Sequence, residues 1–275
     1  MKITKTKLKQ IIKEEVVKLL TENEDQKNAL KILDLLDHED PDWFAQGVAL
    51  YSLFKEDIEV NAPAENDQIL EKLRVINQFT GPGIQDVGFL SGLKEINITE
   101  QIDLSWCRSL QNVNGLEGLT NLTTLDLEGC KSLQNVDGLK ECTNLTSLLL
   151  RECTSLQNVD VLKECTNLTS LNLGRCSKLE NVDGLQGLTN LTSLNLSWCE
   201  SLQNVDALQG LASLTTLDLY RCESLENIDG LQGLTNLTSL DLYRCESLPR
   251  ALQRSFQSSE YYGTAYEQFM EVLKG

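Results

Sequence analysis

The sequence predicts an α/β fold, a right-handed solenoid of about seven parallel strands with helical caps at both ends. Three observations predict it. Cysteines recur every 23 residues from Cys107 to Cys245, and three rows of leucines recur in step with them. Within each unit two leucines alternate with polar residues, as in Leu125-Asp126-Leu127, which is the spacing of a strand. One unit cannot bury its leucines alone, so the units are expected to stack.

These residues resemble the leucine-rich repeat family, and within it the cysteine-containing variants, whose pattern is L-x-x-L-x-L-x-x-N/C-x-L. The resemblance covers residues 86–248. This sequence departs from the pattern in two ways. The leucine after Cys130 comes three residues on, at Leu133, and the 23-residue period is shorter than that class usually has. The resemblance therefore implies short 3₁₀ turns or loops on the outer side, where longer repeats have full helices.

The chain is expected to have four parts, which are 1–22, 23–85, 86–248 and 249–275. The first is a basic amphipathic helix, with six Lys and two Glu in residues 1–20. The second is a helical N-terminal cap with helices over Asp25–Leu36, from Asp40-Pro41 onward and over Asn66–Phe79. The third is the solenoid. The fourth, after Pro249, is a helical C-terminal cap.

The nine cysteines are expected to be buried core residues, because they form no close pairs of the kind that metal or redox sites use. Cys142 and Cys165 fall where other units have leucine. Two further rows are expected to be structural. In one row, aspartates such as Asp137 are expected to cap a short helical turn, and in the other, asparagines such as Asn135 are expected to bond the backbone. The recurring Asn-Leu-Thr triplets are attributed to the repeat, with Asn bonding the turn.

Three columns of residues around each strand vary from unit to unit, while the framework hardly changes. In a stacked fold such variation is where a partner can be recognised. Trp, Tyr and Arg are the residues enriched at interface hot spots, and several of them fall on consecutive strands. The predicted partner-binding residues are Trp198, Tyr220, Arg221, Tyr243 and Arg244, together with Arg175, Arg151 and Trp106. The alternative is that they are solvated strand residues that stack on one another.

The leading functional hypothesis is a non-catalytic protein-recognition module that binds an unknown protein partner on the concave face of its sheet. A net charge of −17 argues against nucleic-acid binding, and the single histidine, His38, leaves little material for imidazole chemistry. No cofactor or metal and no membrane span are expected. The alternatives are an effector or assembly component addressed by its N-terminal helix, and an enzyme with catalysis outside the repeats. A monomer in a reducing, cytoplasmic setting without a signal peptide is expected.

Overall fold

The computed structural model describes residues 24–249. The chain divides into two compact units, with the boundary after Val75. The predicted helices over residues 1–22 and 249–275 lie outside the described residues, apart from Pro249 itself.

The first unit is helical. Residues 24–36 form a helix, followed by α2 (Pro41–Asn61) and α3 (Pro63–Arg74). Asp40 begins α2 as predicted, because its carboxylate accepts a hydrogen bond from the Asp42 N–H at 2.9 Å. The Tyr51 hydroxyl donates to Asn66 Oδ1 at 2.8 Å and so joins α2 to α3 in the core of this unit. Burial raises the pKa of Tyr51 to about 12.

The predicted helix over Asn66–Phe79 was partly wrong. The helix begins earlier, at Pro63, and ends at Arg74, where Val75 and Ile76 form the short strand β1. Pro63 sets the start because its fixed φ suits the first helical turn. The end was misplaced because Ile76 continues the helical spacing of Ile69 and Leu73, although it is buried as part of a strand.

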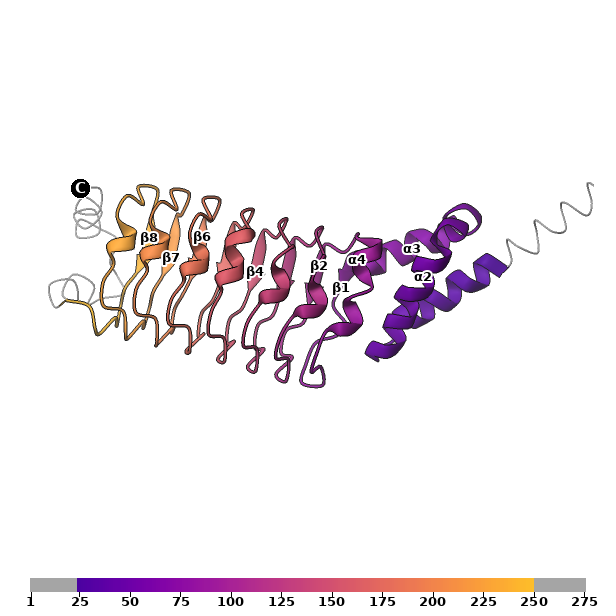
Figure 1. Ribbon diagram of the computed structural model, residues 1–275, viewed down its shortest axis with the longest axis horizontal. Coiled ribbons are helices and arrows are strands. Elements are labelled where there is room, and N and C mark those ends of the chain that lie inside the picture. The colour runs from indigo at the N-terminus through magenta and orange to yellow at the C-terminus, as the bar shows by residue number, and fades with distance from the viewer. Residues whose placement is uncertain (1–23, 250–275) are drawn as a thin grey trace, which may run out of the picture. The chain divides into compact units, whose positions relative to one another are not determined.

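The second unit is the predicted solenoid, in which each 23-residue repeat forms one rung (Figure 1). Eight parallel strands follow one another in sequence order in an open sheet. Neighbouring strands pair residues 23 apart, as in Leu125 with Leu148 and Leu148 with Leu171. The strands after β1 are β2 (Gln101–Asp103), β3 (Thr124–Asp126), β4 (Ser147–Leu149), β5 (Ser170–Asn172), β6 (Ser193–Asn195), β7 (Thr216–Asp218) and β8 (Ser239–Asp241).

Short helical turns lie on the other side of the rungs, as the repeat length implies. Most are single 3₁₀ turns of three residues, because 23 residues leave no room for a long helix after the strand and its turns. They are η1 (Gly88–Leu90), η2 (Asn114–Leu116), η3 (Asp137–Leu139), η4 (Asp160–Glu164), η5 (Asp183–Leu185), η6 (Asp206–Leu208) and η7 (Asp229–Leu231), with a four-residue α4 (Leu93–Ile96) in the first rung.

The core of the solenoid consists of the leucine rows and the cysteines, as predicted. All nine cysteines are free and buried. Each Sγ points to a backbone carbonyl in the preceding rung; Cys153, for example, lies 3.2 Å from the Leu127 oxygen. Burial raises the pKa of Cys199 to about 12 and that of Cys165 to about 11, so these thiols stay protonated near neutral pH.

Polar side chains form further ladders between rungs. The asparagine of the Asn-Leu-Thr triplets donates to a carbonyl of the rung before, as Asn144 does to the Thr120 oxygen at 2.9 Å. The threonine that follows does the same, as Thr146 does to the Thr123 oxygen at 3.0 Å. The structural interpretation of the triplets is therefore confirmed.

The predicted capping role of the aspartate row was wrong. No side-chain hydrogen bond caps η3, and Asp137 is exposed. Asn135 Oδ1 instead accepts the Asp137 N–H at 3.2 Å, and the same contact recurs at Asn181 and Asn204. The asparagine two residues earlier therefore satisfies the backbone at the start of five of the seven turns.

Candidate binding surface on the sheet face

Three positions at the end of each strand face away from the leucine core, and they correspond to the three variable columns. The first column is more structural than its variation suggested. In rung after rung its Asp or Asn side chain accepts the N–H of the residue two positions later, as Asp126 does from Glu128 at 2.8 Å and Asn195 does from Ser197 at 2.9 Å. Asp and Asn interchange here because both offer the same oxygen.

The third column adopts a left-handed backbone conformation directly after the strand. Its non-glycine members have φ between 58° and 65°, and they are Trp106, Glu152, Arg175, Trp198, Arg221 and Arg244; Gly129 has φ 74°. A left-handed non-glycine residue costs about 1–3 kcal/mol. Six of the seven rungs nevertheless keep a side chain where glycine fits without strain.

Aromatic and arginine side chains from the last four rungs lie together. The ring centroids of Trp198 and Tyr220 are 5.7 Å apart, and those of Tyr220 and Tyr243 are 5.9 Å apart. The Arg221 guanidinium lies 4.1 Å from the Trp198 ring centroid, within the range of a cation–π contact. We call this set the aromatic–arginine patch; its members are Arg175, Trp198, Tyr220, Arg221, Tyr243 and Arg244.

Arginine stacking extends across the whole patch. Arg175 lies 5.1 Å from the Trp198 ring, so two guanidinium groups approach the indole from the rungs on either side of it. Arg244 lies 5.5 Å from the Tyr243 ring. These contacts restrict the side chains before any partner binds, which lowers the entropy lost on binding.

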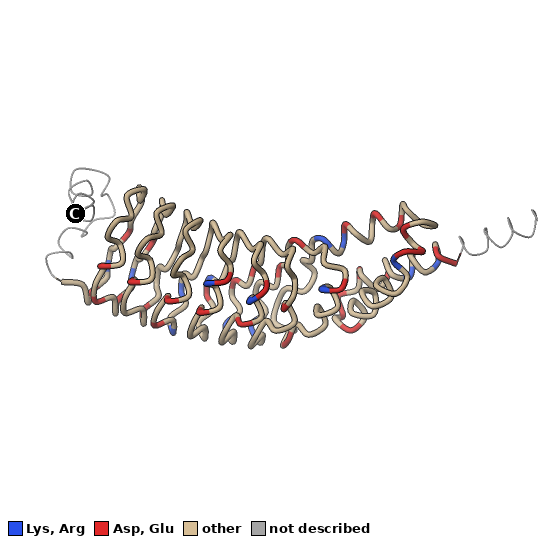
Figure 2. The backbone as a smooth tube through the Cα atoms, turned by 45° about the horizontal axis from the view of Figure 1, so that its top comes forward, with Lys and Arg blue, Asp and Glu red and all other residues tan. Residues whose placement is uncertain are grey.

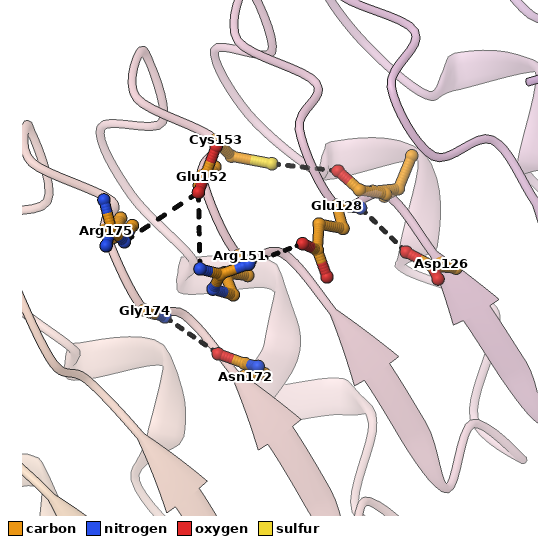
Figure 3. A network of polar contacts seen from close by, with 9 residues as sticks. Asp126, Glu128, Arg151, Glu152, Cys153, Asn172, Gly174 and Arg175 are labelled. Atoms are coloured by element: carbon orange, nitrogen blue, oxygen red, sulfur yellow. Dashed lines mark hydrogen bonds and ion pairs between the residues drawn. The ribbon is translucent and has the colours of Figure 1, made fainter. Parts of the chain in front are cut away.

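The preceding rungs present charged residues that pair with one another (Figure 3). Arg151 lies 2.7 Å from Glu128 and 3.4 Å from Glu152, and Arg175 lies 3.8 Å from Glu152. We call Glu128, Arg151, Glu152 and Arg175 the ion-pair cluster. Arg175 therefore belongs to both groups and marks the border between them.

Two of the predicted site residues lie away from the patch. Trp106 follows β2, with the rungs of Gly129 and Glu152 between it and Arg175. It is 40% exposed, and its ring covers Gly129, where an added Cβ would come within 2.6 Å of the indole. Arg151 is occupied in the ion-pair cluster. The remaining six predicted residues are brought together.

The sequence analysis missed a fourth row of outward positions, at the start of each strand. This row holds only small or polar residues, with Ser or Thr in six of its seven positions; its members are Gln101, Thr124, Ser147, Ser170, Ser193, Thr216 and Ser239. This row hardly varies from rung to rung, so the variation that marks the other three columns does not mark it. Because its side chains are short, this row leaves the neighbouring columns accessible.

Acidic positions recur along the rungs and in the helical unit (Figure 2). Burial raises the pKa values of Asp126 and Asp218 in the first column.

Among residues 24–249 no group of three or more His, Cys, Asp or Glu is arranged to hold a metal ion. None of the helices in that range is long and apolar enough to span a membrane.

Two family models match the chain. Residues 97–183 match the one described as the "Endo-beta-N-acetylglucosaminidase EndoS LRR domain", and residues 182–260 match "Zer-1-like, Leucine-rich repeats". Together they span the rungs from β2 onward. No curated protein sequence matches the chain.

Similar solved structures include bacterial leucine-rich repeat proteins. One from T. pallidum is 19% identical, with a TM-score of 0.36, and the alignment covers 60% of this chain and 85% of that one. One from Leptospira interrogans is 17% identical, with a TM-score of 0.30 and 67% of each chain covered. The functional domain of InlJ from Listeria monocytogenes, which includes a cysteine ladder, is 15% identical, with a TM-score of 0.22, and covers 66% of this chain and 60% of that one.

Proposed function

This chain is a leucine-rich repeat protein, and from that premise we propose that it is a non-catalytic module that binds a protein partner against the sheet face of its solenoid. The fold is that of a protein-interaction module. The finer proposal is that the partner contacts the aromatic–arginine patch.

The observation that supports this proposal is the contiguity of the patch. Trp198, Tyr220 and Tyr243 come from consecutive rungs, and their rings lie 5.7 Å and 5.9 Å apart. Each ring offers a large area with few rotatable bonds, and each arginine offers a planar set of donors. Such residues supply most of the binding energy in protein interfaces.

Backbone strain supports the sheet face as the binding side, although it also occurs at Trp106 and Glu152 and so does not single out the patch. Trp198, Arg221 and Arg244 keep their side chains at left-handed positions that glycine would occupy at lower cost. Strain of this kind is found where a side chain is needed for function. The buried core gains nothing from these three residues, because they project from the opposite side of the strand end.

The test begins with peptides selected from a phage-displayed library on the full chain, because such a selection does not require the partner to be known. Replacing Trp198, Tyr220 and Tyr243 with Ala should lower the affinity for the selected peptides by about 30-fold or more, which is the effect of losing a hot spot. Circular dichroism and the urea midpoint check that the variant still folds.

Trp106→Ala is the matched control, because it removes an exposed tryptophan from the same column but outside the patch. It should leave the affinity unchanged. Equal affinity of the triple variant and the parent chain would reject the patch as the binding site. Loss of binding in Trp106→Ala alone would move the site to the first rungs.

A further inference from the structure

We propose that the aromatic–arginine patch recognises carboxylate side chains on an acidic segment of the partner protein. This inference rests on the proposed function and adds the chemistry of the ligand. It is argued from the charges and the hydrogen-bond donors that the described residues leave without partners.

The arginines at the far end of the patch differ from those in the ion-pair cluster. Within residues 24–249 neither Arg221 nor Arg244 forms an ion pair, whereas Arg151 is held between two glutamates. The Arg221 Nε is buried and makes no hydrogen bond within the same range. In a chain with 41 acidic and 24 basic residues, the sequence offers ample carboxylates to pair these arginines. Within the described residues, Arg221 and Arg244 are nevertheless without an acidic partner.

Stacking on an aromatic ring does not use the N–H donors of an arginine. A guanidinium that lies over an aromatic ring keeps its N–H groups in its own plane, so it can bind a carboxylate edge-on at the same time. Arg221 is held in this way 4.1 Å from the Trp198 ring. The rings would contact the apolar parts of the segment while the arginines bind its charges.

Two asparagines of the first column offer further donors. Asn172 and Asn195 use Oδ1 to accept backbone N–H groups at 3.0 Å and 2.9 Å, which turns their Nδ2 groups outward. Those Nδ2 groups make no hydrogen bond within the described part of the chain. Gly174 belongs to the rung of Asn172, and a Cβ added there would lie 3.2 Å from Asn172 Oδ1 and 3.1 Å from Asn195 Oδ1, so the two amide oxygens face this position. These two Nδ2 groups add hydrogen-bond donors to the sheet face in the rungs of Arg175 and Trp198.

The same features favour a carboxylate over a phosphate group. Asp218 and Asp241 adjoin the patch in the first column, and their charge repels a phosphate dianion more than a single carboxylate. The arginines also come from separate rungs, with an aromatic ring between Arg175 and Arg221. This spacing suits several single charges along a segment.

The experiment measures fluorescence anisotropy of the full chain with three labelled peptides. The first repeats Glu-Glu-Tyr-Tyr, the second has Gln in place of Glu, and the third has phosphoserine in place of Glu. The glutamate peptide should bind about 10- to 100-fold more tightly than the glutamine peptide, the range expected for charge-assisted hydrogen bonds. It should also bind more tightly than the phosphoserine peptide.

Asn195→Asp is the most informative variant. Aspartate occupies the equivalent position in four other rungs, at 103, 126, 218 and 241, so the turn and the fold are retained. The change replaces a hydrogen-bond donor with a negative charge. It should lower the affinity for the glutamate peptide about 10-fold or more and leave the affinity for the glutamine peptide unchanged. Arg221→Ala should act in the same direction. Arg108→Ala removes a guanidinium stacked 5.8 Å from Trp106 and is the matched control, expected to have no effect.

Equal binding of the glutamate and glutamine peptides, binding of neither, or an unchanged affinity in Asn195→Asp would overturn the inference. Tighter binding of the phosphoserine peptide would overturn the assignment of a carboxylate. These outcomes differ from a failure of the proposed function. In that case the library-selected peptides would bind the variant without Trp198, Tyr220 and Tyr243 as tightly as the parent chain. If those peptides respond to the aromatic variant but not to Arg221→Ala, the binding surface stands and the acidic ligand falls.

Discussion

The first-column side chains combine two roles that the sequence alone does not separate. Asp103 and Asn172 look like variable surface residues, yet each closes the turn after its strand by accepting the N–H two residues later. Leu149 alone breaks the series and makes no such contact. The variation in this column is therefore limited by the hydrogen bond to the backbone, whereas the third column is limited by its left-handed conformation and the second column carries neither constraint.

Asp126 illustrates the cost of choosing aspartate for that role. Burial raises its pKa, so its ionised form is penalised in the folded chain relative to the unfolded one. An asparagine side chain at this position would keep the hydrogen bond to the Glu128 N–H, as asparagine does in the rungs of Asn172 and Asn195. We expect Asp126→Asn to raise the urea midpoint at pH 7.

The sign of the pH effect follows from the raised pKa. As the pH falls, the folded chain takes up this proton before the unfolded chain does, and the penalty disappears. The advantage of Asp126→Asn should therefore shrink between pH 7 and pH 4, as measured by urea unfolding at both values. A variant that is less stable than the parent at pH 7 would show that the charge is used by a neighbour.

At the scale of elements, periodicity predicted the rungs well because each strand must place two leucines in the core. The 23-residue spacing also sets the register, since every strand pairs with its neighbours at that offset. The left-handed turn was not predictable, because glycine marks it in one rung only, at Gly129. The contacts of Arg175 were also not predictable, since the sequence does not show that it lies between the ion-pair cluster and the aromatic rings of the patch.

The second residue is glycine or alanine in five of the seven 3₁₀ turns, which lets these turns approach the rung before closely; η1 has Phe89 and η4 has Val161 instead. A Cβ added at Gly184 would lie 1.9 Å from the Val159 carbonyl oxygen of the rung before, too close for the backbone to remain in place. Gly184→Ala should therefore lower the free energy of unfolding by about 1–3 kcal/mol, the usual range for overpacking. Urea unfolding measures the change.

Ala207→Gly provides the comparison, because Ala207 occupies the same position in η6 and is accommodated there. It should cost less than about 1 kcal/mol, the helix-interior penalty of glycine. If Gly184→Ala were as mild as Ala207→Gly, the spacing between rungs would be more adaptable than the structure indicates.

At the scale of the whole solenoid, stability comes from contacts between adjacent rungs, as in other repeat proteins. Removing residues 154–176 joins Cys153 to Ser177 and deletes one complete period, so the leucine, threonine and cysteine rows all stay in step. We expect this shortened chain to fold with a native-like circular dichroism spectrum. Its urea m value should be smaller, because less surface is buried.

Removing residues 154–165 is the control, since it takes away about half a period and places polar residues where leucines belong. That chain should lose the cooperative transition. If both deletions folded alike, the rows would not determine the stacking. The first deletion also tests the division of the sheet face, because it removes Arg175 and leaves Trp198, Tyr220 and Tyr243 on consecutive rungs.

The side-chain ladders between rungs all run in one direction. Cys176 Sγ contacts the Leu150 oxygen, Thr169 Oγ1 donates to the Thr146 oxygen and Asn167 Nδ2 donates to the Thr143 oxygen, so the donor always belongs to the later residue. During synthesis on a ribosome, the side-chain donors of each new rung would find the carbonyl oxygens of the preceding rung already in place. The backbone hydrogen bonds run both ways, since the Thr146 N–H donates to the Thr123 oxygen and the Leu127 N–H donates to the Leu149 oxygen, so the backbone of each rung is satisfied only when the next rung has formed.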